Sequence, residues 1–196
     1  VCCACGGGNR TFADASEFKK IKDVIARVPR DGTRTVVSIN ASRVAWGDVI
    51  TIRDGQNIFL EGNIFSANQR PVLDGQNFNP HFYIMEGGTF GARNVEFANG
   101  WASRIHYTQG FGASIYSEGT ILLLENCTFR NNKADKDGGA IDISGPASRI
   151  DVVTGCIFEG NVAREYGGAV SIFGSALANG LVIANSSFSG NKMDLG

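Results

Sequence analysis

Four aspartates in the second half of the chain are the residues best suited to catalysis, and basic side chains lie among them. The aspartates are Asp135, Asp137, Asp142 and Asp151, and the basic residues are Arg130, Lys133 and Lys136. Clustered carboxylates can hold calcium while a basic residue removes a proton, or two carboxylates can act as acid and base on a glycosidic bond. One hypothesis is therefore a polysaccharide lyase or hydrolase.

The place of these acids in the sequence argues against that hypothesis. Asp135 and Asp137 belong to the segment ADKD, which we assign to a turn, and the corresponding segment AREY at 163–166 keeps only one acid. A charged cluster in a turn is usually a solvated loop. No nucleophile elbow, P-loop or dinucleotide fingerprint occurs in the sequence. We therefore expect no catalytic residues, no bound metal ion and no cofactor.

Aromatic residues offer a second kind of site, because their rings can stack on sugars. The candidates are Trp46, Trp101, Tyr107, Phe111, Tyr116 and Tyr166, and the stretch 101–112 concentrates several of them in what we interpret as an enlarged turn. The simpler interpretation is that these rings cover the corners of the fold. We favour it and keep polysaccharide binding as the alternative.

The five cysteines fall into two groups with different expected chemistry. Cys2, Cys3 and Cys5 crowd the N-terminus but lack the fourth Cys or nearby His that zinc needs. We expect disulfides there, including one to a neighbouring module or subunit. Cys127 and Cys156 lie at equivalent positions on adjacent strands, within disulfide reach, but we slightly favour a pair of small buried hydrophobic residues.

Four N-x-[ST] sequons indicate N-glycosylation if the protein is made in a eukaryotic cell. They begin at Asn9, Asn40, Asn126 and Asn185. If strand alternation points the neighbouring cysteine, serine and phenylalanines inward, then Asn126 and Thr128 face outward, as do Asn185 and Ser187, so two sequons share one outward column. Because a bulky glycan tolerates no burial, this placement favours Asn126 and Asn185 as acceptors.

Length and composition limit the class of protein. The chain has 196 residues, of which 43% are hydrophobic, so it can form one domain with a sizeable core. Only 19% of residues are charged and 26 are glycines, which suits short strands and many turns. A net charge of −1 without a Lys/Arg cluster argues against nucleic acid as a partner. No apolar run is long enough to span a membrane, and the start at Val1 suggests a processed or partial product.

One helix is predicted, within residues 13–32, and strands follow it. Asp14 can cap the helix and Glu17 stands three residues later, as in a capping box. The apolar residues Phe18, Ile21, Val24, Ile25 and Val28 follow helical spacing to the breakers Pro29 and Gly32. From residue 35 onward, short β-branched runs alternate with Gly, Asn and Asp, which indicates strands separated by turns.

A repeat of about thirty residues shows how those strands are arranged. Phe97, Phe129, Phe158 and Phe188 recur at intervals of 32, 29 and 30 residues, and Asn132, Asn161 and Asn191 stand three residues after the last three. Gly-Gly pairs recur at 138–139 and 167–168. Three short strands and three turns in each repeat predict one coil of a parallel β-solenoid.

The stacked coils place equivalent residues in columns. We expect Val95, Cys127, Cys156 and Ser186 to point inward, with the four phenylalanines as a second inward column. The asparagines suit tight turns and can link their amides from coil to coil, and the glycine pairs permit the next corner. The helix is placed to cover the first coil.

The repeated phrases FRNN…GGAI and FEGN…GGAV resemble the repeats of polymorphic outer-membrane-protein-type adhesins. The longer pattern, with its N-terminal helix, GDVITI strand and ENCTF coil, resembles right-handed parallel β-helix proteins of the pectin-lyase-like superfamily. The motif pairs cover residues 112–191, whereas the coils from residue 35 match in style only. The resemblance implies an all-β, right-handed parallel β-helix, a fold that carries lyases, epimerases, adhesins and structural fibres alike.

Together these observations predict a cysteine-rich segment at 1–12, a capping helix within 13–32 and β-helix coils over 33–196, the last coil incomplete. We expect a non-catalytic structural or adhesive module, secreted or on a cell surface. It would be one glycosylated subunit or repeat of an extracellular filament or surface assembly, stacked end to end on copies of itself or on neighbouring modules. The alternative is a polysaccharide-binding or pectate-lyase-like β-helix.

Overall fold

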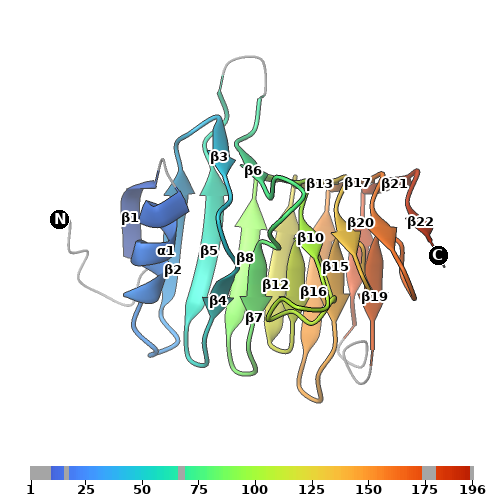
Figure 1. The fold of residues 1–196 in the computed structure, drawn as a ribbon. Coiled ribbons are helices and arrows are strands. Elements are labelled where there is room, and N and C mark those ends of the chain that lie inside the picture. Colours follow the sequence, from blue (N-terminus) through green and yellow to red (C-terminus); the bar gives the residue numbers. More distant parts are fainter. Residues whose placement is uncertain (1–9, 16–17, 66–68, 174–179, 195–196) are drawn as a thin grey trace.

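The chain folds into a β-solenoid in which the paired strands of successive coils run parallel (Figure 1). The computed structural model describes residues 10–15, 18–65, 69–173 and 180–194. Its strands form four sheets that run along the stack, and one helix, α1 (Phe18–Ala26), lies at the N-terminal end of the described residues. The predicted all-β solenoid is confirmed.

Two of the four sheets supply most of the wall. The long sheet consists of β1 (Arg10–Ala15), β2 (Arg34–Ile39), β5 (Asn57–Gly62), β8 (Thr89–Arg93), β12 (Thr120–Glu125), β16 (Arg149–Thr154) and β20 (Val182–Ala184). The phenylalanine sheet consists of β3 (Arg43–Ala45), β6 (Val72–Asp74), β9 (Glu96–Ala98), β13 (Thr128–Arg130), β17 (Ile157–Glu159) and β21 (Ser187–Ser189). Its name refers to the phenylalanines at the centre of β9, β13, β17 and β21.

The other two sheets close each coil. The short sheet consists of the two-residue strands β10 (Trp101–Ala102), β14 (Lys133–Ala134), β18 (Val162–Ala163) and β22 (Lys192–Met193). The tyrosine sheet consists of β4 (Ile50–Ile52), β7 (Phe82–Ile84), β11 (Ile115–Ser117), β15 (Ile141–Ile143) and β19 (Val170–Ile172). The repeat was predicted to hold three strands. From β8 onward each coil adds a fourth, because the chain pairs for two residues before it reaches the tyrosine sheet.

The N-terminal part differs from the sequence prediction. Residues 10–15 form β1, which pairs in parallel with β2, and the helix begins only at Phe18. Asp14 lies in that strand, so the predicted N-cap is wrong, and Glu17 lies outside the described residues. Helix α1 does cover the first coils, because Ile21 and Ile25 are buried in the main core.

The phenylalanine column fills the interior as predicted. Phe97, Phe129, Phe158 and Phe188 stand in register on paired strands, with ring centroids 4.9, 4.8 and 4.6 Å apart and interplanar angles of 6°, 7° and 1°. The first three rings are buried, whereas Phe188 in the last described coil is 49% exposed. Stacking places each ring on a hydrophobic neighbour above and below, so the column buries large apolar area in every coil.

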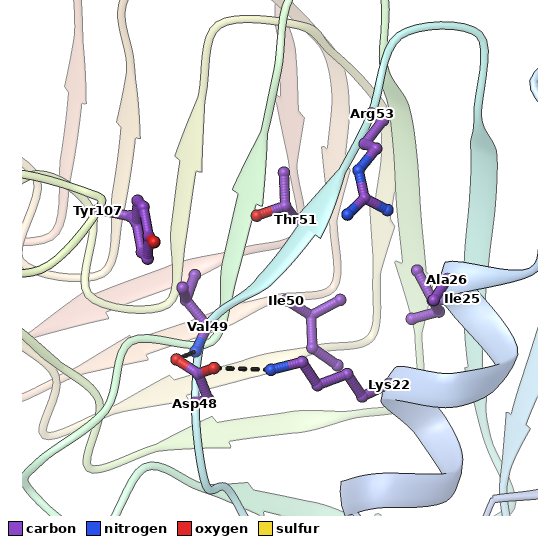
Figure 2. A pocket seen from close by; sticks show the side chains of 9 residues that line it. All are labelled: Lys22, Ile25, Ala26, Asp48, Val49, Ile50, Thr51, Arg53 and Tyr107. Atoms are coloured by element: carbon purple, nitrogen blue, oxygen red, sulfur yellow. Dashed lines mark hydrogen bonds and ion pairs between the residues drawn. The ribbon is translucent and has the colours of Figure 1, made fainter.

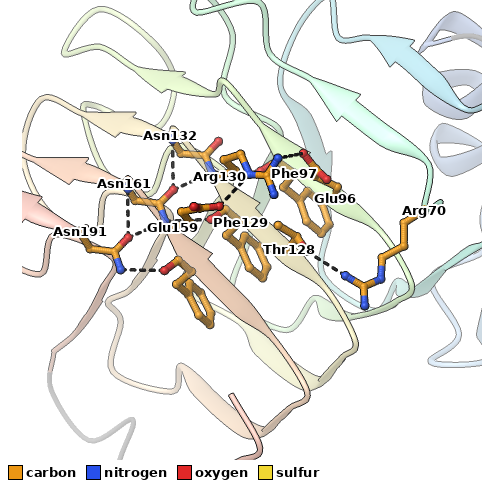
Figure 3. Close-up of polar contacts among 11 residues, drawn as sticks. Arg70, Glu96, Phe97, Thr128, Phe129, Arg130, Asn132, Glu159, Asn161 and Asn191 are labelled. Carbon is orange, nitrogen blue, oxygen red and sulfur yellow. Dashed lines mark hydrogen bonds and ion pairs between the residues drawn. The ribbon is translucent and has the colours of Figure 1, made fainter. Parts of the chain in front are cut away.

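The asparagines form a second column next to the phenylalanines (Figure 3). Asn132 donates from Nδ2 to Oδ1 of Asn161 at 2.9 Å, and Asn161 donates in the same way to Asn191 at 2.8 Å. The Asn161 Nδ2 also donates to the carbonyl oxygen of Phe129 at 2.9 Å. The amide ladder is confirmed. The left-handed residue of this turn, however, is the preceding one, such as Asn131 with φ of 53°.

The Gly-Gly pairs are required at the corner before the tyrosine sheet. Gly138 has φ of +64°, a left-handed conformation that glycine adopts without strain. A Cβ on Gly139 would collide with the carbonyl oxygen of Gly168 in the next coil. The first glycine of the pair therefore serves the turn, and the second lets consecutive coils approach closely.

Candidate functional site

The outer face of the tyrosine sheet carries two of the residues singled out from the sequence, Tyr116 and Asp142. In each strand of this sheet the central residue points outward, and the residues on either side of it point inward. The column reads Thr51, Tyr83, Tyr116, Asp142 and Ser171 along the stack. The parallel register therefore places these five residues in one continuous row across the sheet.

Tyr83 and Tyr116 form a stacked pair that shares one carboxylate. Their ring centroids are 5.1 Å apart at an interplanar angle of 11°. The Tyr83 hydroxyl donates to Oε2 of Glu118 at 2.5 Å, and the Tyr116 hydroxyl donates to Oε1 at 3.0 Å. Partial burial and the Glu118 carboxylate raise the pKa of Tyr83, and burial is the main cause that raises the pKa of Tyr116 to about 12. Both phenols therefore stay protonated near neutral pH.

Sequence reasoning named Tyr116 but missed Tyr83 and Glu118. A signal existed, because Tyr83 is the outward residue of the strand HFYIM and Glu118 stands two residues after Tyr116 on the same face. Recognising the pair required the register between β7 and β11, which the repeat spacing alone did not give, since the two coils are separated by the enlarged turn.

The enlarged turn supports the tyrosine pair from one side. The Phe111 ring stacks on Tyr116 at 5.5 Å and 23°, and the Lys136 ammonium lies 4.3 Å from the centroid of Phe111. Trp101 Nε1 donates to Oδ1 of Asp135 at 3.3 Å. These three candidate aromatics therefore make contacts within the fold, as the corner-covering interpretation predicted for them, and a fourth candidate, Trp46, is fully buried in the main core.

Two of the four candidate aspartates are enclosed beside this face. Asp142 is 0% exposed and accepts a hydrogen bond at Oδ2 from Ser144 Oγ at 2.7 Å. Burial raises the pKa of Asp142 to about 6. Asp137 is also buried; its Oδ1 accepts from the Tyr166 backbone N–H at 3.0 Å, and burial raises its pKa. Neither carboxyl group is presented to solvent as an exposed acid or base.

The remaining charged candidates lie elsewhere. Asp151 belongs to the long sheet and pairs with Arg149 at 3.3 Å. Arg130 belongs to the phenylalanine sheet, where it pairs with Glu159 at 3.1 Å and Glu96 at 3.7 Å (Figure 3). The structure therefore brings Asp137 and Asp142 to one region and does not assemble all four acids with a basic residue.

A cleft of about 350 Å³ lies between helix α1 and strand β4, at one end of the tyrosine sheet (Figure 2). Ile25 and Ile50 form its apolar floor, and Lys22 and Asp48 form an ion pair of 2.6 Å at its edge. The other lining residues are Ala26, Val49, Thr51, Arg53 and Tyr107. Tyr107 is 81% exposed, so its ring is open to a ligand, in contrast to Phe111.

The four sequons stand in different environments. Asn9 lies outside the described residues. Asn40 is half-buried and accepts a hydrogen bond from Asn63. Asn126 and Asn185 occupy equivalent positions beyond paired strands, as predicted, and Asn185 is exposed.

The expectation that Thr128 is open to solvent is wrong. Thr128 is only 2% exposed, because Arg70 from the segment before β6 lies over it and donates to its Oγ1 at 2.9 Å. Arg70 also donates to Oδ1 of Asn126, and Asn126 Nδ2 donates to Asn94 Oδ1 at 2.6 Å. The nitrogen that would carry a glycan on Asn126 is therefore engaged within the fold. The long-range contact from Arg70 could not be seen in the repeat pattern.

Cys127 and Cys156 are both buried and both free, so the structure has no disulfide between them. Their thiols donate to backbone carbonyls, that of Cys127 to Glu125 at 3.4 Å and that of Cys156 to Leu124 at 3.4 Å. Burial raises the pKa of Cys127 well above its ordinary value. The pair acts as small core residues, which is the interpretation favoured from the sequence. Cys2, Cys3 and Cys5 lie outside the described residues.

Neither a metal-ligand cluster nor a membrane-spanning helix occurs in the described part of the chain. No group of three or more His, Cys, Asp or Glu side chains there could hold a metal ion. No helix there is long and apolar enough to cross a membrane.

Fold and surface define a parallel β-solenoid protein with an aromatic and acidic outer sheet. The sequence model of the right-handed β-helix region matches residues 30–194, and the chain therefore belongs to that family. The predicted handedness agrees with this assignment. No curated protein and no solved structure matches the chain.

Proposed function

We propose that this chain is a non-catalytic structural or adhesive β-helix module of an extracellular filament or cell-surface assembly. The observation that carries the proposal is the pair of continuous ladders, phenylalanine and asparagine, that run through successive coils. Ladders of this kind bind each coil to its neighbours along the stack, which suits an elongated repeat module. Copies or neighbouring modules stacked end to end would extend the same ladders.

The acidic residues also favour a structural role. A catalytic carboxyl group must reach the substrate, yet Asp137 and Asp142 are buried and hydrogen-bonded within the fold. Asp135 and Asp151 instead contact Trp101 and Arg149. These contacts are those expected of residues that hold turns and strands in place.

Two experiments test this proposal. The folded protein is incubated with a panel of acidic and neutral polysaccharides while new reducing ends and unsaturated products are followed; no turnover is expected. Turnover that disappears in Asp142→Asn would overturn the proposal. An antibody against the folded domain is expected to label intact cells, and labelling that requires permeabilisation would contradict the proposed location.

The two sequons of the outward column differ in how open their asparagines are. Asn185 is exposed, whereas Asn126 is held by Arg70 and Asn94, so Asn185 is the better acceptor in the folded chain. Mass analysis of protein secreted by a eukaryotic cell, before and after N-glycan removal, is expected to place a glycan on Asn185. A glycan on Asn126 alone would contradict this choice.

Polysaccharide binding remains the second candidate function, and the cleft beside helix α1 favours it. An exposed aromatic ring (Tyr107), a hydroxyl (Thr51) and a guanidinium (Arg53) surround an apolar floor, which is a common composition of sugar-binding sites. Titration with oligosaccharides is expected to show binding that Tyr107→Ala abolishes. Tyr166→Ala is the matched control, because Tyr166 is also exposed but does not line the cleft.

A further inference from the structure

We propose that Tyr83 and Tyr116 form an oxidative cross-linking site, in which a one-electron oxidant joins the two rings into dityrosine within one chain. The modification would tie strand β7 to strand β11 covalently across consecutive coils. It goes beyond the structural role proposed above and does not depend on it.

The geometry places both reacting rings together before any reaction. The rings stand on directly paired residues of parallel strands, with centroids 5.1 Å apart and an interplanar angle of 11°. Neighbouring parallel strands keep their backbones about 4.8 Å apart, so the two side chains cannot drift away from each other. Holding two reactants in this way replaces a bimolecular encounter by an intramolecular one.

Glu118 supplies the proton acceptor. Oxidation of a phenol removes an electron and the hydroxyl proton, and the bound carboxylate is positioned to accept that proton from either ring, at 2.5 Å from Tyr83 and 3.0 Å from Tyr116. An isolated exposed tyrosine such as Tyr107 has no such carboxylate among its contacts in the described residues. Shared hydrogen bonding therefore distinguishes this pair from the other two tyrosines of the chain.

The step balances with hydrogen peroxide as the final oxidant and a haem peroxidase as the catalyst. Each phenol loses one electron and one proton, and the two phenoxyl radicals join through the ring carbons next to the oxygen-bearing carbons. The hydrogen on each joined carbon then returns to its phenolic oxygen as a proton, which restores both rings. The two electrons and two protons reduce one peroxide to two waters.

Both rings are half-buried on the outer face of the sheet, so they remain partly accessible to the oxidant. The new carbon–carbon bond requires the rings to tilt from the stacked arrangement toward edge-to-edge contact. Both rings stand at outward positions of their strands, so the tilt displaces no side chain of the main core, although Tyr116 must shift relative to the Phe111 ring that stacks on it.

The chain contains only four tyrosines, which allows a clean test. In a Tyr107→Phe/Tyr166→Phe background only Tyr83 and Tyr116 remain. Treatment with a haem peroxidase and hydrogen peroxide is expected to produce dityrosine fluorescence in the monomer and a mass lower by two hydrogen atoms. Tryptic mapping is expected to link the peptide that contains Tyr83 to the peptide that contains Tyr116, at a yield independent of protein concentration.

Matched variants separate the proposal from nonspecific oxidation. Tyr83→Phe in this background is expected to abolish the monomeric product, and Glu118→Gln to slow its formation several-fold while circular dichroism stays unchanged. Unfolding in urea is expected to reduce the yield sharply. Dityrosine only between chains, a yield unaffected by urea, or no product in folded wild-type protein would overturn the proposal.

Discussion

His81 is a fully buried histidine (0% exposed) whose ring lies in an aromatic environment, with centroids 5.6 Å from Trp46 and 5.8 Å from Phe97. Its Nε2 lies 2.9 Å from the carbonyl oxygen of Leu73, which can only accept, so the neutral ring donates there. Nδ1 has no hydrogen-bond partner in the described residues. Burial lowers the pKa of His81 to about 4.

This residue should make stability depend on pH. The unfolded chain takes up a proton at the ordinary histidine pKa of 6.5, whereas folded His81 does so at about 4. Its contribution is therefore fully present above pH 6.5 and is lost as the pH falls toward 4. The loss should reach about 2.5 kcal/mol at about pH 4.5, to be measured by urea unfolding there and at neutral pH.

His81→Gln supplies the comparison, because glutamine has no charge to gain. The difference in unfolding free energy between wild type and His81→Gln is expected to fall as the pH is lowered. Taking this difference cancels the titration of all groups common to both proteins. A difference that stays constant with pH would show that the folded pKa of His81 is not lowered by burial.

Asp142 should act in the opposite direction. Its folded pKa is about 6 and its ordinary value is 3.8, so the folded state binds the proton more tightly and gains stability as the pH falls from 6. Above pH 6 the buried charge destabilises the fold. Asp142→Asn is therefore expected to raise the unfolding free energy by about 1–3 kcal/mol at neutral pH, and this gain should shrink at about pH 4.5.

Asp151→Asn is the matched control for that prediction. Asp151 is half-exposed and pairs with Arg149 at the surface, so its replacement should change stability by less than about 1 kcal/mol. If Asp142→Asn destabilised the protein at every pH, its carboxylate would instead be making contacts that outweigh its burial.

At the residue level, the sequence predicts well those positions whose roles recur with the period of the repeat. Phe129, Asn161 and Gly138 were placed correctly, because their roles repeat from coil to coil. Thr128 was not, since the side chain that covers it, Arg70, is 58 residues away in sequence. Contacts made by irregular segments leave no periodic signal.

The asparagine ladder is the element whose loss should be most informative. Asn161 Oδ1 accepts from both the backbone N–H and the side-chain amide of Asn132, at 3.1 and 2.9 Å. Its Nδ2 donates to the carbonyl oxygen of Phe129 at 2.9 Å. Asn161→Ala would leave these buried partners unsatisfied, at a cost of about 1–3 kcal/mol for each group.

We expect Asn161→Ala to lower the unfolding free energy by at least about 3 kcal/mol in urea titrations. Glu159→Ala is the control in the same coil. Glu159 is exposed and its ion pair with Arg130 lies at the surface, so a loss below about 1 kcal/mol is expected. Equal losses in the two variants would mean that the ladder contributes no more than a surface pair.

Strands that are specified by their own residue pattern were predicted well. Strands that form because they pair with a neighbouring strand were predicted poorly. Among the β-branched runs that begin at residue 35, TVVSI (35–39) and NIFLEG (57–62) match β2 and β5. The sequence of β1 (RTFADA) resembles a helix start because it contains a capping residue, yet it pairs with β2 instead. Pairing with an existing sheet edge satisfies backbone groups that local propensity does not describe. The two-residue strands of the short sheet likewise depend on their neighbours.

For the whole molecule, the solenoid is a one-dimensional stack in which each coil contacts mainly the coils on either side. Stability is then close to a sum of coil terms and interfaces between neighbouring coils. The cleft lies in the first part of that stack, between helix α1 and strand β4. The tyrosine pair lies in the middle part and connects two consecutive coils. The sequence predicted the stack from its repeats, but the cleft depends on where the helix meets β4, which no repeat encodes.

Hydrogen exchange in this 196-residue chain should reflect that arrangement. The coil that contains β12 and β13 has a packed coil on both sides, whereas the coil of β20–β22 is covered on one side only among the described residues. Amides of β12 and β13 are therefore expected to exchange most slowly and those of β20–β22 most quickly.

Phe129→Ala removes a ring enclosed by Phe97 and Phe158, at a cost of about 3–5 kcal/mol. Exchange should then accelerate in the coils on both sides of residue 129, whereas acceleration spread evenly over all sheets would show that the chain opens as a single cooperative unit.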